Sequence, residues 1–122
     1  MLVYISGKIG PGGITPEVKE KFAKAEQILR QQGYKVINPV SDEYQESLIH
    51  ASIKAYTKDS RFYGLVVGDP YTLALAHGIM SIIVADAIAF LPDYRSSRGA
   101  MAEYYFAKAI EKIRINIKLT NN

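Results

Sequence analysis

Residues 85–99 read ADAIAFLPDYRSSRG, and this stretch decides how the chain folds. Ala87–Leu91 is a short apolar run, which is typical of a strand buried on both faces. The polar segment at residues 92–98 is expected to be a loop, and an alanine-rich helix is expected from Gly99 to about Lys112. A buried strand that leads through a polar loop into a helix is the unit from which parallel α/β sheets are built.

The same order of elements is predicted at the start of the chain. Leu2–Ile5 is apolar, and the sequence GKIGPGG at Gly7–Gly13 must be a loop. Thr15 can act as the N-cap of a helix with Pro16 as its first residue, and Gly33 can end that helix. Apolar residues recur along one face of this helix, at Val18, Phe22, Ala25 and Leu29.

The remaining elements follow from shorter patterns. Tyr34–Ile37 indicates a second strand, and residues 41–56 are compatible with a helix, while residues 57–70 are expected to be irregular. Thr72–Ala85 is apolar almost all round, which predicts a helix buried between layers. Ile113–Leu119 alternates apolar and polar residues, which predicts a last strand with one solvated face.

This order predicts one α/β domain over residues 1–122, a flavodoxin-like or Rossmann-like three-layer domain with a central parallel sheet in the order 2-1-3-4. The carboxyl ends of the first and third strands then lie side by side. The loops at residues 7–13 and 92–99 meet there, and ligands of such sheets bind where the strand order reverses.

Composition restricts the ligand. Lysine and arginine number 15 and aspartate and glutamate 12, a net charge of +3 without a basic run, which favours a small anion over a nucleic acid polymer. There is no cysteine, and His50 and His77 are not spaced as a metal pair, so neither a metal nor a cofactor is expected.

Asp86 and His77 interrupt the apolar stretch 73–91 and argue against a membrane span. Without a signal peptide pattern, the expected location is the cytoplasm.

Two features of the loop and helix after the third strand suggest a site. Ser97 precedes the helix as an N-cap, and Lys8, Arg95 and Arg98 can add positive charge for a phosphate, although the arginines are equally compatible with solvated loop residues. Glu103 is either an exposed helix carboxylate or, with Ala100 and Ala107 on the same face, directed towards the crevice. A carboxylate near a sugar carbon can act as a nucleophile in glycosyl chemistry.

Four stretches of the chain carry a family resemblance: YISGKIG at residues 4–10, FAKAEQILRQQGYKVINP at 22–39, ADAIAFLPDYRSSRGAMAE at 85–103 and YYFAKA at 104–109. With these stretches the chain resembles the nucleoside 2-deoxyribosyltransferase-like superfamily, and most closely a small subgroup without an assigned function. The resemblance covers about Leu2–Pro39 and Ile79–Ile117.

The resemblance implies roles for these residues. Glu103 corresponds to the nucleophile that attacks C1′ of a 2-deoxyribosyl group, and Tyr4 to the tyrosine that orients it. Ser97 stands where related nucleotide N-hydrolases place a serine on a 5′-phosphate and where transferases of free nucleosides place an aspartate. The residues implied to contact substrate are Gly7, Lys8, Ile9, Ser97, Arg98 and Gly99.

One position departs from the family pattern. Active members usually carry an aspartate, the acid that assists departure of the base, where this chain has Gly78. His77 and Asp93 are the nearest candidate substitutes, and His77 can carry a proton near neutral pH.

Three readings of the function follow. The first is an N-glycosidase or deoxyribosyltransferase-like enzyme that cleaves the base from a 2′-deoxynucleoside 5′-phosphate. The alternative is a nucleotide-binding or sensing module that has lost turnover, and the third is an interaction domain without a small ligand. Apolar surface in excess of what one small sheet can cover, together with the resemblance, predicts a homodimer or larger homo-oligomer.

Overall fold

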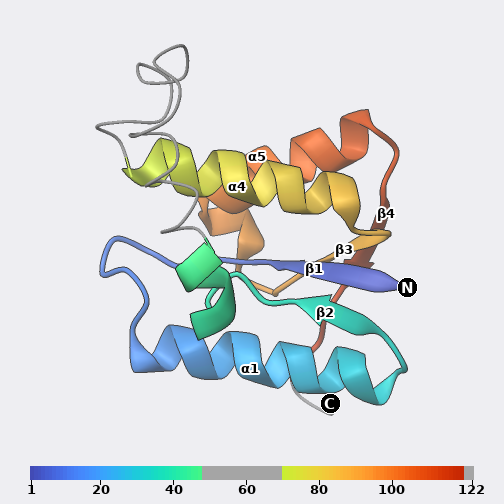
Figure 1. The fold of residues 1–122 in the computed structure, drawn as a ribbon, viewed down its shortest axis with the longest axis horizontal. Helices are drawn as coiled ribbons and strands as arrows, with labels where there is room; N and C mark the ends of the chain where they lie inside the picture. Colours follow the sequence, from blue (N-terminus) through green and yellow to red (C-terminus); the bar gives the residue numbers. More distant parts are fainter. Residues whose placement is uncertain (48–69, 120–122) are drawn as a thin grey trace.

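The computed structural model describes residues 1–47 and 70–119 and has a four-stranded, all-parallel sheet (Figure 1). The strands are β1 (Leu2–Ser6), β2 (Lys35–Ile37), β3 (Ala87–Phe90) and β4 (Ile113–Asn116), in the spatial order β2-β1-β3-β4. Tyr4 pairs with Ile37 on one side and with Ile88 on the other. The predicted strand order and the Rossmann-like three-layer α/β fold are therefore confirmed.

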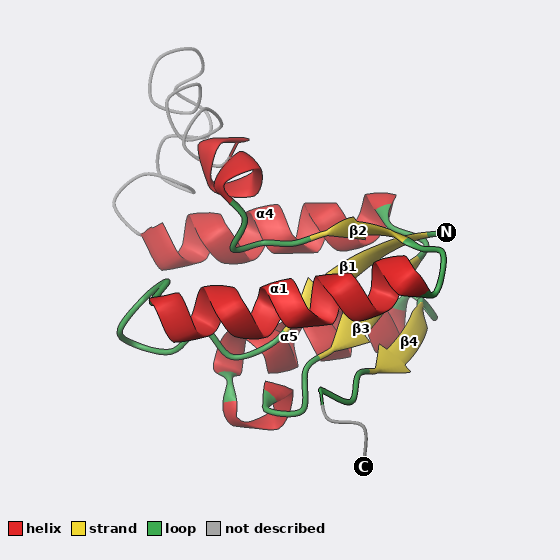
Figure 2. Ribbon diagram, turned by 90° about the horizontal axis from the view of Figure 1, so that it is seen from below, coloured by secondary structure: helices red, strands yellow, loops and turns green. Residues whose placement is uncertain are grey.

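Helices cover both faces of this sheet. Helix α1 (Pro16–Gln31) lies on one face, and α4 (Pro70–Val84) and α5 (Arg98–Ala109) lie side by side on the other. The view from below in Figure 2 shows α1 in front of the strands, with α4 and α5 behind them. A short 3₁₀ helix, η2 (Tyr94–Ser96), interrupts the loop between β3 and α5.

The capping residues confirm the predicted start and end of α1. The Thr15 hydroxyl accepts a hydrogen bond from the Val18 N–H, and Pro16 is the first helical residue. After the C-cap, Gly33 has φ of +91°, a left-handed conformation that glycine adopts without steric cost. All four residues of the predicted apolar face of α1 are buried.

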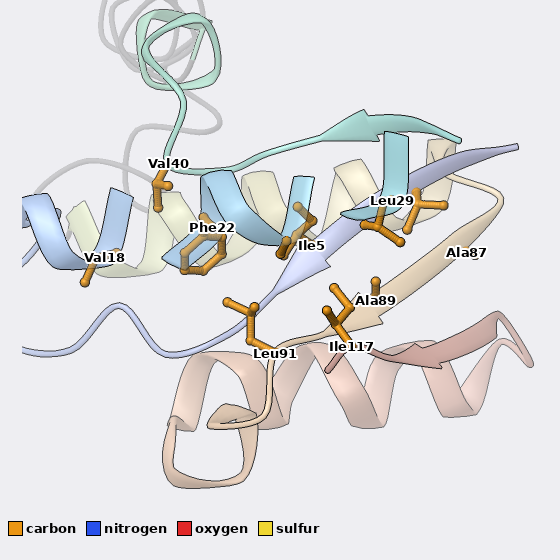
Figure 3. Packing of buried hydrophobic residues seen from close by; sticks show 11 residues of the cluster. Ile5, Val18, Phe22, Leu29, Val40, Ala87, Ala89, Leu91 and Ile117 are labelled. Carbon is orange, nitrogen blue, oxygen red and sulfur yellow. The ribbon is translucent and has the colours of Figure 1, made fainter. Parts of the chain in front are cut away.

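The larger hydrophobic cluster lies between α1 and the sheet (Figure 3). Phe22 and Leu29 of α1 pack there against Ile5 of β1, Ala89 of β3 and Leu91. A second cluster on the opposite face contains Tyr4, Ile82, Ile88, Phe90 and Ala107. The two clusters fix α1 and the α4–α5 pair against one rigid sheet.

The prediction that residues 72–85 form a helix buried between layers is wrong in its burial. Helix α4 begins at Pro70 and packs onto the sheet through Ile82. Met80 is 62% exposed, Ile83 52% and Val84 70%. Hydropathy along the sequence reports how apolar a helix is and not how much of it the rest of the chain can cover.

Other differences concern the ends of elements. Strand β4 stops at Asn116, and Ile113 at its start is exposed, so the alternation expected up to Leu119 is only partly a strand. Residues 42–47 are helical, in agreement with the first part of the predicted helix at 41–56. The rest of that helix and the segment from 57 to 69 lie outside the described residues.

Within residues 1–47 and 70–119, no helix combines the length and apolar character needed to cross a membrane.

Candidate active site

Glu103 lies in the second turn of α5 and faces the sheet. It is 7% exposed, and Ala100 and Ala107 on the same helix face are 2% and 0% exposed. The small side chains let this face of α5 lie against the sheet. Of the two placements that the sequence left open for Glu103, the structure therefore has the buried one.

Two residues of β1 hold the Glu103 carboxylate. The Tyr4 hydroxyl donates a hydrogen bond to Oε2 at 2.8 Å, and the Ser6 hydroxyl donates to Oε1 at 2.7 Å. Alternate residues of a strand point to the same face of a sheet, so β1 presents both donors towards α5. The resemblance placed Tyr4 at this carboxylate. Ser6 was missed, although its spacing of two from Tyr4 gives it the same side of the strand.

Burial changes the ionisation of this group. It raises the pKa of Glu103 from 4.5 to about 7, although the hydrogen bonds from Ser6 and Tyr4 act in the opposite direction. The pKa of Tyr4 is raised well above 10.0, first by burial and then by the neighbouring Glu103. Tyr4 therefore keeps its proton as a donor, while Glu103 exchanges its own proton near neutral pH.

Gly78 of α4 closes the site from the other side. A Cβ atom at this position would overlap Glu103 Oε2 and would lie 2.9 Å from the Tyr4 hydroxyl oxygen. Only a residue without a side chain fits between α4 and this carboxylate. The aspartate that the family pattern places at this position would have to displace α4 or Glu103, so the departure at Gly78 goes together with the close packing of Glu103.

His77 and Tyr44 form an aromatic pair beside this packing. Their rings meet edge to face with centroids 4.8 Å apart, and the Tyr44 hydroxyl lies 3.2 Å from the Ser81 hydroxyl. Burial lowers the pKa of His77. In the described part of the chain, its Nδ1 is the one buried side-chain nitrogen or oxygen without a hydrogen-bond partner. A neutral histidine with an unpaired ring nitrogen can accept or donate a proton on contact with a ligand.

Tyr44 was not identified from the sequence. It belongs to the helical residues 42–47, in a segment whose apolar pattern is weak. The pKa of Tyr44 is raised, first by burial and also by the charge of Glu103, while its hydrogen bond with Ser81 acts in the opposite direction. No local sequence signal identifies such a residue, because its position depends on how α4 packs.

The glycine loop after β1 is attached to the segment after β3. The Asp93 carboxylate accepts a hydrogen bond from the Lys8 N–H at 3.0 Å and binds the Lys21 ammonium group at 2.5 Å. A Cβ atom at Gly7 would overlap the Leu91 side chain, so only glycine allows this approach. Ile9 packs against the hydrophobic cluster on the α1 side of the sheet. Its role in lining a substrate pocket stays a prediction.

Ser97 caps α5 as predicted. Its hydroxyl accepts a hydrogen bond from the Ala100 N–H at 3.2 Å. Arg98 is exposed, and a Cβ atom at Gly99 would lie 3.2 Å from the hydroxyl oxygen of Tyr71 in the first turn of α4. The Tyr71 side chain of α4 therefore reaches the start of α5, and the positive end of the helix dipole there favours an anion.

Glu103 follows Ser97 by six residues, which is about 9 Å along a helix that rises 1.5 Å per residue. That separation leaves room for a sugar between an anion at Ser97 and a carbon atom at Glu103. Among residues 1–47 and 70–119, no cluster of three or more histidine, aspartate or glutamate side chains is arranged to hold a metal ion. Around Glu103 the described side chains bring together one buried carboxylate and two hydroxyl donors.

Comparison with known proteins finds one family. A family model described as "Domain of unknown function (DUF4406)" matches residues 1–117. No curated protein and no solved structure matches the chain.

Proposed function

Since the chain belongs to the DUF4406 family, whose description names no activity, we propose its function from the site: an N-glycosidase or deoxyribosyltransferase-like enzyme that acts on a 2′-deoxynucleoside 5′-phosphate. The observation that carries the proposal is the buried Glu103 carboxylate, held by Tyr4 at 2.8 Å and Ser6 at 2.7 Å. A carboxylate fixed in this way, with little water around it, is suited to attack a sugar carbon. The resemblance to the nucleoside 2-deoxyribosyltransferase-like superfamily supports the same reading.

The reaction has two steps. A Glu103 oxygen attacks C1′, an ester bond forms between them, and the bond from C1′ to the base nitrogen breaks with its electron pair on the base. Water or a second base then attacks C1′ and frees the carboxylate. Only the ionised form of Glu103 attacks, so its pKa of about 7 predicts that base release increases with pH between about 6 and 8.

The departing base needs a proton. Both oxygens of Asp93 already accept hydrogen bonds, from Lys8 and Lys21, so this carboxylate is poorly placed to donate one. His77 has the unpaired ring nitrogen and is the remaining candidate, although burial lowers its pKa and so favours its neutral form. Proton donation by solvent is the remaining route, and it predicts slow turnover.

One observation favours the alternative function, a nucleotide-binding module without turnover. Gly78 covers one oxygen of Glu103, and both oxygens already accept hydrogen bonds in this structure. If α4 stays in place when a nucleotide binds, the carboxylate has no open path to C1′. The module would then bind nucleotides and release no base.

The exposed apolar face of α4 supports a homo-oligomer. Met80, Ile83 and Val84 are each more than half exposed, and burying such side chains in a contact between two copies gains roughly 25 cal/mol per Å² of apolar surface. The predicted cytoplasmic location stays a prediction.

The test measures, by chromatography, the release of free base from a panel of 2′-deoxynucleosides and their 5′-monophosphates. Glu103→Gln keeps the size of the side chain but removes the nucleophile, so the rate should fall by at least about 10³-fold. Glu20→Gln, at an exposed position of α1, is the matched control and should retain the wild-type rate.

Base release that survives in Glu103→Gln would show that another group is the nucleophile. No base release by wild type, together with nucleotide binding that Glu103→Gln leaves unchanged or tighter, would support the binding module.

A further inference from the structure

Lys21, Asp93 and Lys8 join three separate segments at the carboxyl end of the sheet. Lys21 of α1 donates to Asp93 Oδ2 at 2.5 Å and to the Lys8 carbonyl oxygen at 2.6 Å. Asp93, on the segment after β3, accepts from the Lys8 N–H at 3.0 Å through its other oxygen. Both main-chain polar groups of Lys8 are therefore held, one by each member of the ion pair.

This arrangement differs from an ordinary surface ion pair. The side chains of Lys21 and Asp93 are 22% and 33% exposed, whereas those of Lys19 and Asp42 are 52% and 94% exposed. A pair with less water around it interacts more strongly, and two additional hydrogen bonds fix its geometry. The cluster can therefore hold a loop in place.

The neighbours of Lys8 are also fixed. Gly7 lies so close to Leu91 that a Cβ atom would overlap that side chain, and Ile9 packs against the cluster beneath α1. The first three residues of the glycine loop are thus attached to the end of β3 and to the core. Gly10 and Gly13, with φ of +85° and +73°, lie beyond this fixed part.

The Lys8 side chain is not used in this attachment. Among the residues that the structure describes, its ammonium group has no ion pair or hydrogen bond, although its main chain has two. Asp93 is four residues before Ser97, so Lys8 is attached beside the segment that leads into the start of α5.

We propose that Lys21 and Asp93 are positioning residues that hold the Lys8 main chain so that the Lys8 ammonium group binds an anionic ligand. On the proposed function, on which this choice of ligand rests, the anion is the 5′-phosphate of the nucleotide. Lys21 also balances the charge of Asp93, which would otherwise repel a phosphate near Ser97. Lys21 itself is already engaged with two acceptors and acts through Lys8.

The first measurement is the hydrogen-exchange rate of the Lys8 amide, which is monitored by nuclear magnetic resonance in the absence of ligand. Lys21→Met should speed this exchange about tenfold or more, because the charge that orders Asp93 is lost, while amides in the middle of β1 keep their rates. Lys21→Arg should restore much of the protection. Lys24→Met, on an exposed position of the same helix, is the matched control and should change nothing.

The second measurement is binding of 2′-deoxynucleoside 5′-monophosphates, the matching nucleosides and inorganic phosphate by calorimetry. Lys8→Met and Lys21→Met should each weaken nucleotide binding about tenfold, the effect expected for loss of one charge-assisted contact, and should leave nucleoside binding unchanged. Since Lys21 acts through Lys8, the double variant should bind no more weakly than Lys8→Met.

Failure of the enzyme and failure of this proposal give different results. If the wild type releases no base, and both single variants bind nucleotide or phosphate more weakly than the wild type, the enzymatic function is refuted and the positioning role is retained. Three results would each overturn the positioning role. The Lys8 amide could exchange at the same rate in Lys21→Met as in the wild type, or the two single losses of nucleotide affinity could add up in the double variant. The third such result is a wild type that binds neither nucleotide nor phosphate.

Discussion

Replacing Glu103 by glutamine should change how the stability of the protein depends on pH. The folded protein holds the proton of Glu103 up to a pKa of about 7, whereas an unfolded chain loses it at about 4.5. Between these values the folded state binds more protons than the unfolded state, so the free energy of unfolding decreases as pH rises. Glutamine carries no such proton, and the variant should lack this component.

The size of the effect follows from the pKa difference. One pKa unit corresponds to about 1.4 kcal/mol, so the shift of Glu103 from 4.5 to about 7 is worth about 3 kcal/mol. This stabilisation is complete below pH 4.5 and is lost as pH rises through about 7. Domains of this size are stable by about 5–15 kcal/mol in total, so the change is large enough to measure.

The assay is urea denaturation of wild type and Glu103→Gln at intervals from pH 4.5 to 8.5. The free energy of unfolding of wild type should fall by about 3 kcal/mol more than that of the variant over this range. Glu20→Gln is exposed and should follow wild type. Parallel curves for wild type and Glu103→Gln would refute the reasoning. A wild type that gains stability relative to the variant as pH rises would show that the hydrogen bonds from Tyr4 and Ser6 outweigh burial.

Three further changes test other parts of the site. Gly78→Ala should destabilise the protein by about 1–3 kcal/mol, because its methyl group overlaps the Glu103 carboxylate, and thermal unfolding at an unchanged or higher temperature would contradict this packing. Ser97→Asp should weaken nucleotide binding at least about tenfold relative to nucleoside binding, measured by calorimetry, and an unchanged ratio would move the phosphate away from this helix start. Light scattering at micromolar concentration should give at least a dimer for wild type and a smaller assembly for Val84→Lys, whereas a monomeric wild type would leave the apolar face of α4 without this partner.

Several features that the sequence predicted have local causes, whereas the strand order β2-β1-β3-β4 followed from the order of the elements and the handedness of their connections. Thr15, Pro16 and Gly33 act through the backbone of their own helix, and the alternation of buried and exposed positions on α1 needs only the helical period. The face shared by Ala100 and Glu103 follows from the same period. These features are determined by a few neighbouring residues and do not depend on the rest of the chain.

The parts that the sequence did not predict depend on contacts between distant segments. Tyr44 reaches Ser81 across 37 residues, and Lys21 reaches Asp93 across 72. No periodicity relates such positions, because the approach of two segments is decided by packing of the whole domain. The exposed face of α4 is the converse case: its apolar residues predict burial, but Met80, Ile83 and Val84 are more than half exposed, and no segment within residues 1–47 and 70–119 covers them.

Gly78 connects the burial of Glu103 with the rate expected of the proposed enzyme. A second carboxylate at this position would face Glu103 directly, and the repulsion between like charges would raise the pKa of one of them enough to make it an acid. With glycine there, the raised pKa of Glu103 comes from burial, and the acid that would protonate the leaving base is missing from α4 at that position. General-acid assistance is worth roughly 10²–10⁴-fold in rate, so the proposed enzyme should turn over more slowly by about that factor unless His77 replaces the acid. If His77 replaces the acid, His77→Ala should release base much more slowly than the wild type. If solvent protonates the leaving base, His77→Ala and the wild type should release base at the same rate.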